Sequence, residues 1–156
     1  ELLDVFDESD LKEMIMSLSK RGLPKSYAQK LCEDVPKGML PHHSFNVIYV
    51  GVGKITGAVE FNIENINNCM IRYGEVTKLN KSTAVIKHQP YKFNEGKLVL
   101  GNEIIEELEY LPEFNDLKFG EVVSIHWNFV VDKINEKQLN NLKKYTKINV
   151  DALNYK

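Results

Sequence analysis

The sequence predicts an α+β protein in which an N-terminal helical hairpin precedes a small β-barrel or curled sheet, and a helix closes the chain. Apolar residues recur with helical spacing in the first 38 residues. From Cys69 onward, short runs rich in β-branched residues alternate with glycine-marked turns. Near the end, Asn135 is followed by Gln138, the spacing of a helix-capping box. Together these patterns favour a small barrel flanked by helices.

The first 38 residues are expected to form two helices. Ser9 is expected to cap a helix that starts at Asp10 and ends at Arg21 and Gly22. Its buried face is given by the spacing i, i+3, i+4, i+7 in Leu11, Met14, Ile15 and Leu18. A second helix is expected from Pro24 to about Glu33, before the break at residues 35–38.

The remaining chain is expected to be mainly β-structure up to Asn135. The expected strands are residues 45–50, 71–79, 83–88, 91–93, 98–100 and one long strand over 122–131. Residues 57–66 suit either a strand or a short helix, and the acidic residues 103–109 suit a short helix or an edge strand with a solvated face. This organisation divides the chain into residues 1–40, 41–68, 69–134 and 135–156.

Composition excludes several classes of protein. The chain has 20 basic and 22 acidic residues and a net charge of -2, so nothing favours a nucleic-acid partner. No apolar run is long enough to span a membrane, and no signal peptide is recognised. The two cysteines, Cys32 and Cys69, fit no zinc-ribbon or CxxC spacing. A cytoplasmic protein is therefore expected rather than a secreted fold held by disulfides, with one structural disulfide as the alternative.

Cys69 and His126 are the main candidates for chemistry. A thiolate at Cys69 is a soft metal ligand or a nucleophile, and Arg72 would favour it, but most free cysteines are small buried hydrophobes. Strand alternation places His126 on one face with Ser124 and Asn128, where it is a metal ligand, a proton carrier or a structural histidine.

The other histidines are weaker candidates. His42 and His43 are adjacent, so in a strand they would point to opposite faces, and one of them would join Cys69 or His126 in a metal site. The alternative for this pair is a polar lead into a strand. His88 stands at a strand end and is expected to face solvent. No phosphate-binding loop, dinucleotide fingerprint or zinc-protease helix is present, so no enzyme is indicated.

Two stretches resemble the HypC/HupF family of small [NiFe]-hydrogenase assembly chaperones. Cys69-Met-Ile-Arg-Tyr-Gly-Glu-Val76 resembles the family's opening Cys-aliphatic-x-aliphatic-Pro-Gly-x-Val motif. Phe119-Gly-Glu-Val-Val-Ser-Ile-His126 resembles its later Gly-Asp-x-Val-x-Val-His motif, and Ile134-Asn-Glu136 resembles the step into its last helix. The resemblance covers about residues 69–153. Tyr73 replaces the family's proline, Trp127-Asn128 replaces a residue-glycine pair, and Cys69 is internal.

The resemblance implies a fold, a cargo and partners. The implied fold is an OB-like β-barrel with a C-terminal helix, and the implied cargo is iron as an Fe(CN)2CO fragment held at Cys69 with His126 in support. The implied partners are a HypD-like scaffold and a metalloenzyme large-subunit precursor. Three functions stay open: a metallocofactor assembly chaperone, a protein-interaction domain that has lost the metal chemistry, and an enzyme that pairs Cys69 with His126.

Overall fold

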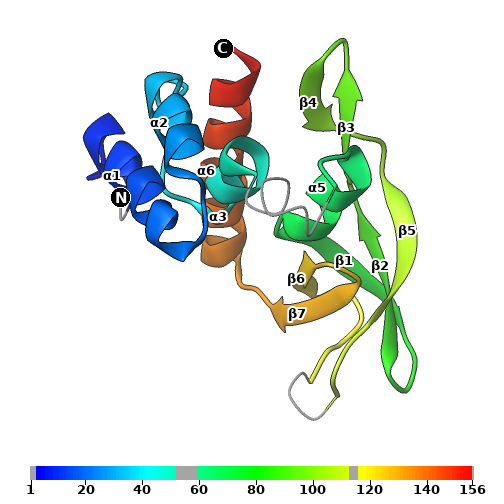
Figure 1. Ribbon diagram of the computed structural model, residues 1–156. Coiled ribbons are helices and arrows are strands. Elements are labelled where there is room, and N and C mark those ends of the chain that lie inside the picture. The colour runs from blue at the N-terminus through cyan, green and yellow to red at the C-terminus, as the bar shows by residue number, and fades with distance from the viewer. Residues whose placement is uncertain (1–2, 52–59, 113–115, 156) are drawn as a thin grey trace. The chain divides into compact units, whose positions relative to one another are not determined.

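The chain is an α+β protein, as predicted, and it forms two compact units. The computed structural model describes residues 3–51, 60–112 and 116–155 (Figure 1). Unit 1 comprises Glu1–Asn62 and Lys143–Lys156, and unit 2 comprises Ile63–Leu142. In the described ranges, no helix has the length and apolar character needed to cross a membrane.

Unit 1 begins with the predicted helical hairpin. It contains α1 (Glu8–Leu18), the short 3₁₀ turn η1 (Ser19–Arg21) and α2 (Lys25–Glu33). The predicted cap at Ser9 is wrong by two residues: the Asp7 carboxylate accepts from the N–H groups of Ser9 and Asp10, and Asp10 accepts in return from the Asp7 N–H. Aspartate at both ends of this reciprocal box also complements the positive helix terminus.

The strand predicted over residues 45–50 is wrong. This stretch forms α3 (His43–Phe45) and the π-helical turn η2 (Asn46–Val50), which ends where the Gly51 N–H donates to the Asn46 carbonyl. Phe45, Ile48 and Val50 are buried. Burial of these bulky side chains outweighs their local preference for a strand, which is a weak and context-dependent quantity. Part of the ambiguous stretch 57–66 lies outside the described residues.

The last helix, α6 (Glu136–Asn154), starts as predicted. The Gln138 N–H donates to the Asn135 side chain, and the Asn135 N–H donates to the Gln138 side chain, each at 2.9 Å. Its second half belongs to unit 1. The buried core of unit 1 consists of Leu11, Ile15, Leu23, Ala28, Leu31, Met39, Phe45 and Val50, against which Ala152 and Leu153 of α6 pack.

Asn149 of α6 is fully buried and forms hydrogen bonds to Leu40, which precedes α3, and to Ser44 within α3. Its Oδ1 accepts from the Leu40 N–H at 2.7 Å, and its Nδ2 donates to the Leu40 carbonyl at 3.0 Å and to Ser44 Oγ at 2.9 Å. One amide therefore satisfies both backbone groups of Leu40, which would otherwise be left without partners away from water.

Asn149→Ala is therefore expected to destabilise the protein by about 2–4 kcal/mol, because it removes three hydrogen bonds and leaves two backbone groups unsatisfied. Asn141→Ala is the matched control, since Asn141 is exposed on the same helix. Urea unfolding followed by circular dichroism measures both. Equal stability of the two variants would show that the Asn149 amide does not hold this segment.

The described residues of unit 2 form helix α5 (Ile63–Cys69), a five-strand ring, a separate β-hairpin and the first part of α6. Helix α5 comes first. The ring has the neighbour order β1-β2-β5-β7-β6, formed by β1 (Arg72–Leu79), β2 (Thr83–His88), β5 (Ile104–Glu109), β6 (Val122–His126) and β7 (Phe129–Lys133). The hairpin pairs β3 (Tyr91–Asn94) with β4 (Lys97–Leu100).

The ring is a mixed sheet. Its antiparallel pairs are β1 with β2, β2 with β5, β1 with β6, and β6 with β7. The one parallel pair, β5 with β7, rests on the single partnership of Glu109 with Phe129. The ring encloses the buried core of unit 2, which consists of Val76, Ala84, Ile86, Leu108, Tyr110, Leu117, Val123, Ile125 and Val130.

Most strand predictions in unit 2 are confirmed, with one correction. The hairpin over 71–88 forms, the pairing of 91–93 with 98–100 is confirmed, and 103–109 contains a strand rather than a helix. The long strand predicted over 122–131 is wrong, because Trp127 and Asn128 form a tight turn between β6 and β7. Trp127 has φ 55°, a left-handed conformation that the β-branched pattern on either side does not reveal.

Candidate functional site

Cys69 and His126 lie at the same end of the ring. Cys69 is the last residue of α5 and His126 the last of β6. The Trp127 N–H donates to the Asn68 carbonyl at 2.7 Å, so the residues that follow His126 and precede Cys69 are bonded to each other. Both side chains are half-buried. The structure therefore places Cys69 and His126 at one end of the ring, each next to a residue of this backbone hydrogen bond.

The Cys69 thiol is not activated. Burial raises its pKa, which favours the neutral thiol over the thiolate. Arg72, which was expected to favour the thiolate, instead directs its guanidinium to Glu106 and to the Trp127 carbonyl. This environment does not favour nucleophilic chemistry at Cys69.

Iodoacetamide is therefore expected to modify Cys69 at pH 7.5 at least about five-fold more slowly in the folded protein than in urea, because less thiolate is present. The measurement uses a Cys32→Ser background, so that Cys69 is the only thiol in the chain. Mass spectrometry over time gives the two rates. A folded rate equal to or above the unfolded rate would indicate an activated cysteine.

His42 and His43 belong to unit 1, whereas Cys69 and His126 belong to unit 2. His42 caps α3: its Nδ1 accepts from the Ser44 N–H at 3.4 Å and lies 2.9 Å from Ser44 Oγ. Burial lowers the pKa of His42, and the neighbouring His43 lowers it further. His43 itself is exposed. Across the described ranges, no group of three or more His, Cys, Asp and Glu side chains is arranged to hold a metal ion.

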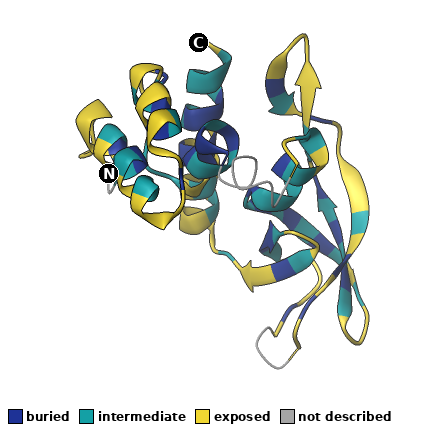
Figure 2. Cartoon of the chain, viewed as in Figure 1, coloured by how far each residue is buried: buried dark blue, intermediate teal, exposed yellow. Residues whose placement is uncertain are grey.

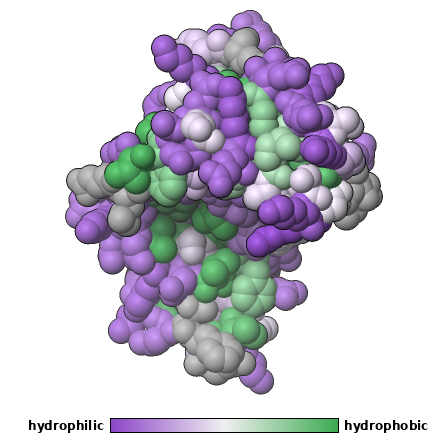
Figure 3. Space-filling model, turned by 60° about the vertical axis from the view of Figure 1, so that its left-hand side comes forward, coloured by the Kyte–Doolittle hydropathy of each residue, from purple (hydrophilic) through white to green (hydrophobic). Residues whose placement is uncertain are grey.

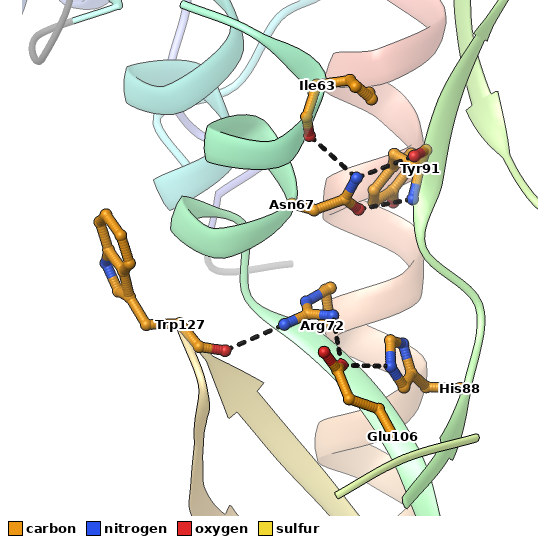
Figure 4. A network of polar contacts seen from close by, with 7 residues as sticks. All are labelled: Ile63, Asn67, Arg72, His88, Tyr91, Glu106 and Trp127. Atoms are coloured by element: carbon orange, nitrogen blue, oxygen red, sulfur yellow. Dashed lines mark hydrogen bonds and ion pairs between the residues drawn. The ribbon is translucent and has the colours of Figure 1, made fainter. Parts of the chain in front are cut away.

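Unit 2 contains a polar cluster that was not predicted from the sequence. It joins Arg72 of β1, His88 of β2 and Glu106 of β5 (Figure 4). Glu106 Oε2 lies 2.9 Å from His88 Nε2 and 3.5 Å from Arg72 Nη1, and Arg72 Nη2 donates to the Trp127 carbonyl at 2.9 Å. The side chains of His88 and Arg72 are 0% and 5% exposed, so the expectation that His88 faces solvent is wrong.

Burial governs the protonation of this cluster. It lowers the pKa of His88, as does the nearby Arg72 charge, while the hydrogen bond to Glu106 acts in the opposite direction. Burial also lowers the pKa of Arg72, against the attraction of Glu106. Arg72 Nε and His88 Nδ1 have no hydrogen-bond partner among the described residues. The alternation of Ala84, Ile86 and His88 along β2 was the available signal that His88 points inward.

Asn67 connects α5 to the β3–β4 hairpin, a role that was not predicted from the sequence. Its Oδ1 accepts from the Tyr91 N–H at 2.6 Å, and its Nδ2 donates to the carbonyls of Tyr91 and Ile63 at 2.8 and 2.9 Å (Figure 4). The side chain thus mimics a strand partner for the first residue of β3. An asparagine inside a helix carries no sequence signal for such a bond.

The hairpin and the start of β5 expose large apolar side chains. Phe93, Leu100, Ile104 and Ile105 are between 41% and 69% exposed. On β3 and β4, Tyr91, Phe93, Leu98 and Leu100 share one face, because Tyr91 pairs with Leu100 and Phe93 pairs with Leu98. Hydrophilic side chains cover much of the molecular face shown in Figure 3. Phe93 and Leu100 therefore lie exposed on one face of the hairpin, and apolar side chains exposed together on one face are typical of interaction surfaces.

These features define an α+β protein whose second unit contains a ring of five strands with a largely buried ionic cluster at one end. The chain belongs to the family described as "Family of unknown function (DUF6390)", whose model matches residues 2–156. No curated protein and no solved structure matches the chain.

The family match corrects the suggested relationship to HypC/HupF. The chain matches DUF6390 over nearly its whole length and shows no HypC-like match, so that assignment is wrong. The two short motifs that suggested it reflect a cysteine before a strand and a histidine at the end of another strand. The iron fragment, the HypD-like scaffold and the large-subunit precursor were implied by that resemblance alone, and they stay untested predictions.

Proposed function

We propose that this protein is a non-enzymatic protein-interaction protein that binds its partner through unit 2. The observation that carries the proposal is the exposure of large apolar side chains along β3, β4 and the start of β5, at Phe93, Leu100, Ile104 and Ile105, with Phe93 and Leu100 on one face of the hairpin. Exposing these side chains to water is unfavourable, by about 25 cal/mol for each Å² of apolar surface, and a bound partner would remove that cost.

The chemistry of the ring supports binding rather than catalysis. The raised pKa of Cys69 disfavours a nucleophile, and the Arg72–Glu106–His88 cluster uses its charges on one another. The proposed partner is a protein and not a nucleic acid, because the exposed side of β5 carries carboxylates. We place the protein in the cytoplasm as part of this proposal, since a chain with only two cysteines, in no zinc-ribbon or CxxC spacing, is typical of that compartment.

The proposed finer fold of unit 2 is an OB-like barrel. In chain order the five ring strands have the neighbour order first, second, third, fifth, fourth, and the third and fifth strands are the parallel pair. A partly open five-stranded Greek-key barrel is the architecture of that fold.

A comparison of two variants in affinity capture tests the function. The chain is immobilised, and proteins retained from a lysate of its native host are quantified by mass spectrometry. Phe93→Ser with Leu100→Ser is expected to lose the specific partner, whereas Phe119→Ser, a change at another exposed aromatic residue of unit 2, is expected to keep it. Equal retention by both variants would contradict the proposal.

A second candidate function is carriage of a soft metal ion by Cys69 and His126. The Asn68–Trp127 hydrogen bond favours it, because that bond brings the two side chains to one end of the ring. Thiolate and imidazole together suit iron, zinc or copper. Cobalt(II) titration tests it: a thiolate-to-metal charge-transfer band should appear, persist in Cys32→Ser and vanish in Cys69→Ser. No band, or a band that survives Cys69→Ser, excludes this site.

A further inference from the structure

The ring leaves most of one edge of β5 unpaired. On one side, β5 pairs with β2 along its whole length, from Ile104 with His88 to Glu109 with Thr83. On the other side, its pairing with β7 is confined to Glu109. Among the described residues, no strand pairs with residues 104–108 on that second side, which we call the open edge of β5. Figure 2 shows β5 largely in the colour of exposed residues.

Two backbone hydrogen bonds establish which backbone groups face the open edge. The Tyr110 N–H donates to the Ser82 carbonyl on the β2 side, and the Glu109 N–H donates to the Asn128 carbonyl on the β7 side. Successive residues of a strand direct their N–H and C=O groups to opposite sides. Ile105 and Glu107 therefore direct both their N–H and C=O groups to the open edge. Both residues are exposed, and Ile105 is 69% exposed.

The side chains beside the open edge are acidic. The two-residue period of a strand places Glu103, Glu107 and Glu109 on the outward face together with Ile105. Glu107 accepts hydrogen bonds from Thr83 Oγ1 and Asn80 Nδ2, which lower the pKa of Glu107.

The basic groups near these carboxylates come from the opposite side. Lys87 of β2 pairs with Glu103 and Glu75, and Lys78 of β1 lowers the pKa of Glu107 further. Both strands lie on the β2 side of β5, so the open edge carries negative charge. A second copy of the chain is a poor occupant, because pairing β5 with β5 would place carboxylates opposite carboxylates.

We propose that the open edge of β5 binds an extended peptide segment of a partner protein by strand addition, and that lysine or arginine alternates with apolar residues in that segment. This inference rests on the proposed function and names the class of partner. Backbone bonds to Ile105 and Glu107 supply affinity in this mode, and the alternate side chains supply specificity. The basic side chains of the peptide contact Glu103, Glu107 and Glu109, and its apolar side chains contact Ile105.

The probe is an acetylated octapeptide that alternates lysine and valine, titrated into the full chain and followed by amide NMR shifts. Shifts are expected at Ile105 and Glu107, with an affinity that falls as salt rises. A peptide with glutamate in place of lysine, and a lysine peptide N-methylated on alternate residues, are each expected to bind at least about ten-fold more weakly. Binding of the glutamate or N-methylated peptide as tight as that of the parent overturns the proposal, as does self-association at β5 in place of peptide binding.

Two protein variants complete the test. Ile105→Pro removes the N–H on the open edge without removing a bond to β2 and is expected to abolish binding, whereas Ile105→Ala keeps that N–H and is expected to retain it. If Ile105→Pro fails to fold, the N-methylated peptide still decides. Loss of the captured partner in the Phe93 and Leu100 variant without any peptide binding at β5 would refute strand addition alone, and equal partner capture would refute the proposed function instead.

Discussion

Gly74→Ala is expected to destabilise unit 2 by about 3 kcal/mol or more, the upper range for overpacking a core. A Cβ at this position of β1 would lie 2.5 Å from Ile86 Cγ2, 2.7 Å from the Lys87 carbonyl oxygen and 2.9 Å from His88 Cβ. One of these contacts is backbone, in the ladder that pairs Gly74 with His88, so no side-chain rotation relieves it. The variant would have to separate β1 from β2.

Gly101→Ala is the control for this prediction. A Cβ there would approach the Pro90 carbonyl at 3.0 Å and otherwise meet only the flexible Lys92 side chain. Gly101→Ala is therefore expected to lower the free energy of unfolding clearly less than Gly74→Ala does. Urea unfolding monitored by the fluorescence of Trp127, the single tryptophan, reports on unit 2 in both variants. Equal losses of stability in the two variants would show that β1 does not pack closely on β2 at Gly74.

Glu106→Ala is expected to lower the free energy of unfolding by about 2–3 kcal/mol. Removal of one partner from a buried ion pair typically costs 3–5 kcal/mol, and the 39% exposure of the Glu106 side chain reduces that figure through solvent screening. The loss leaves the Arg72 guanidinium buried with a hydrogen bond to the Trp127 carbonyl and without its carboxylate partner. The matched control is Glu109→Ala, an exposed carboxylate on the same strand, which should stay within about 0.5 kcal/mol of the parent.

The same cluster predicts a pH dependence. The pKa of His88 is lowered below 6.5 in the folded protein, so the unfolded chain takes up a proton first as pH falls. His88 therefore contributes stability above pH 6.5, and that stability is lost as pH falls from 6.5 towards the folded pKa. His88→Gln is expected to show a shallower loss of stability between pH 7.5 and 5.5. An unchanged slope in urea unfolding would show that His88 does not titrate on unfolding.

The sequence predicted the elements whose local and tertiary preferences agree. The helices α1, α2 and α6 have apolar faces or capping boxes that survive in the fold, and the turn at residues 80–82 fixes the hairpin of β1 and β2. The strand predicted over residues 45–50 was wrong because a run of β-branched and aromatic side chains is equally suited to a buried helix.

The candidate site was predicted only in part, for a different reason. Cys69 and His126 were found as chemically capable residues, and the fold places both at one end of the ring. The Arg72–Glu106–His88 cluster depends on the register of three strands, in which His88 pairs with Ile104 and Gly74 pairs with His88. A sequence read one strand at a time does not contain that register. The open edge of β5 likewise follows from the single Glu109–Phe129 pairing.

Amide hydrogen exchange along β5 tests the open edge most directly. Ile105 and Glu107 direct their N–H groups to the open edge, whereas Glu106 and Leu108 direct theirs to β2. Residue-resolved NMR should therefore show protection that alternates along the strand, with Glu106 and Leu108 exchanging at least about a hundred-fold more slowly than Ile105 and Glu107. Equal protection of all four amides would mean that β5 is paired on both sides, and it would contradict the account.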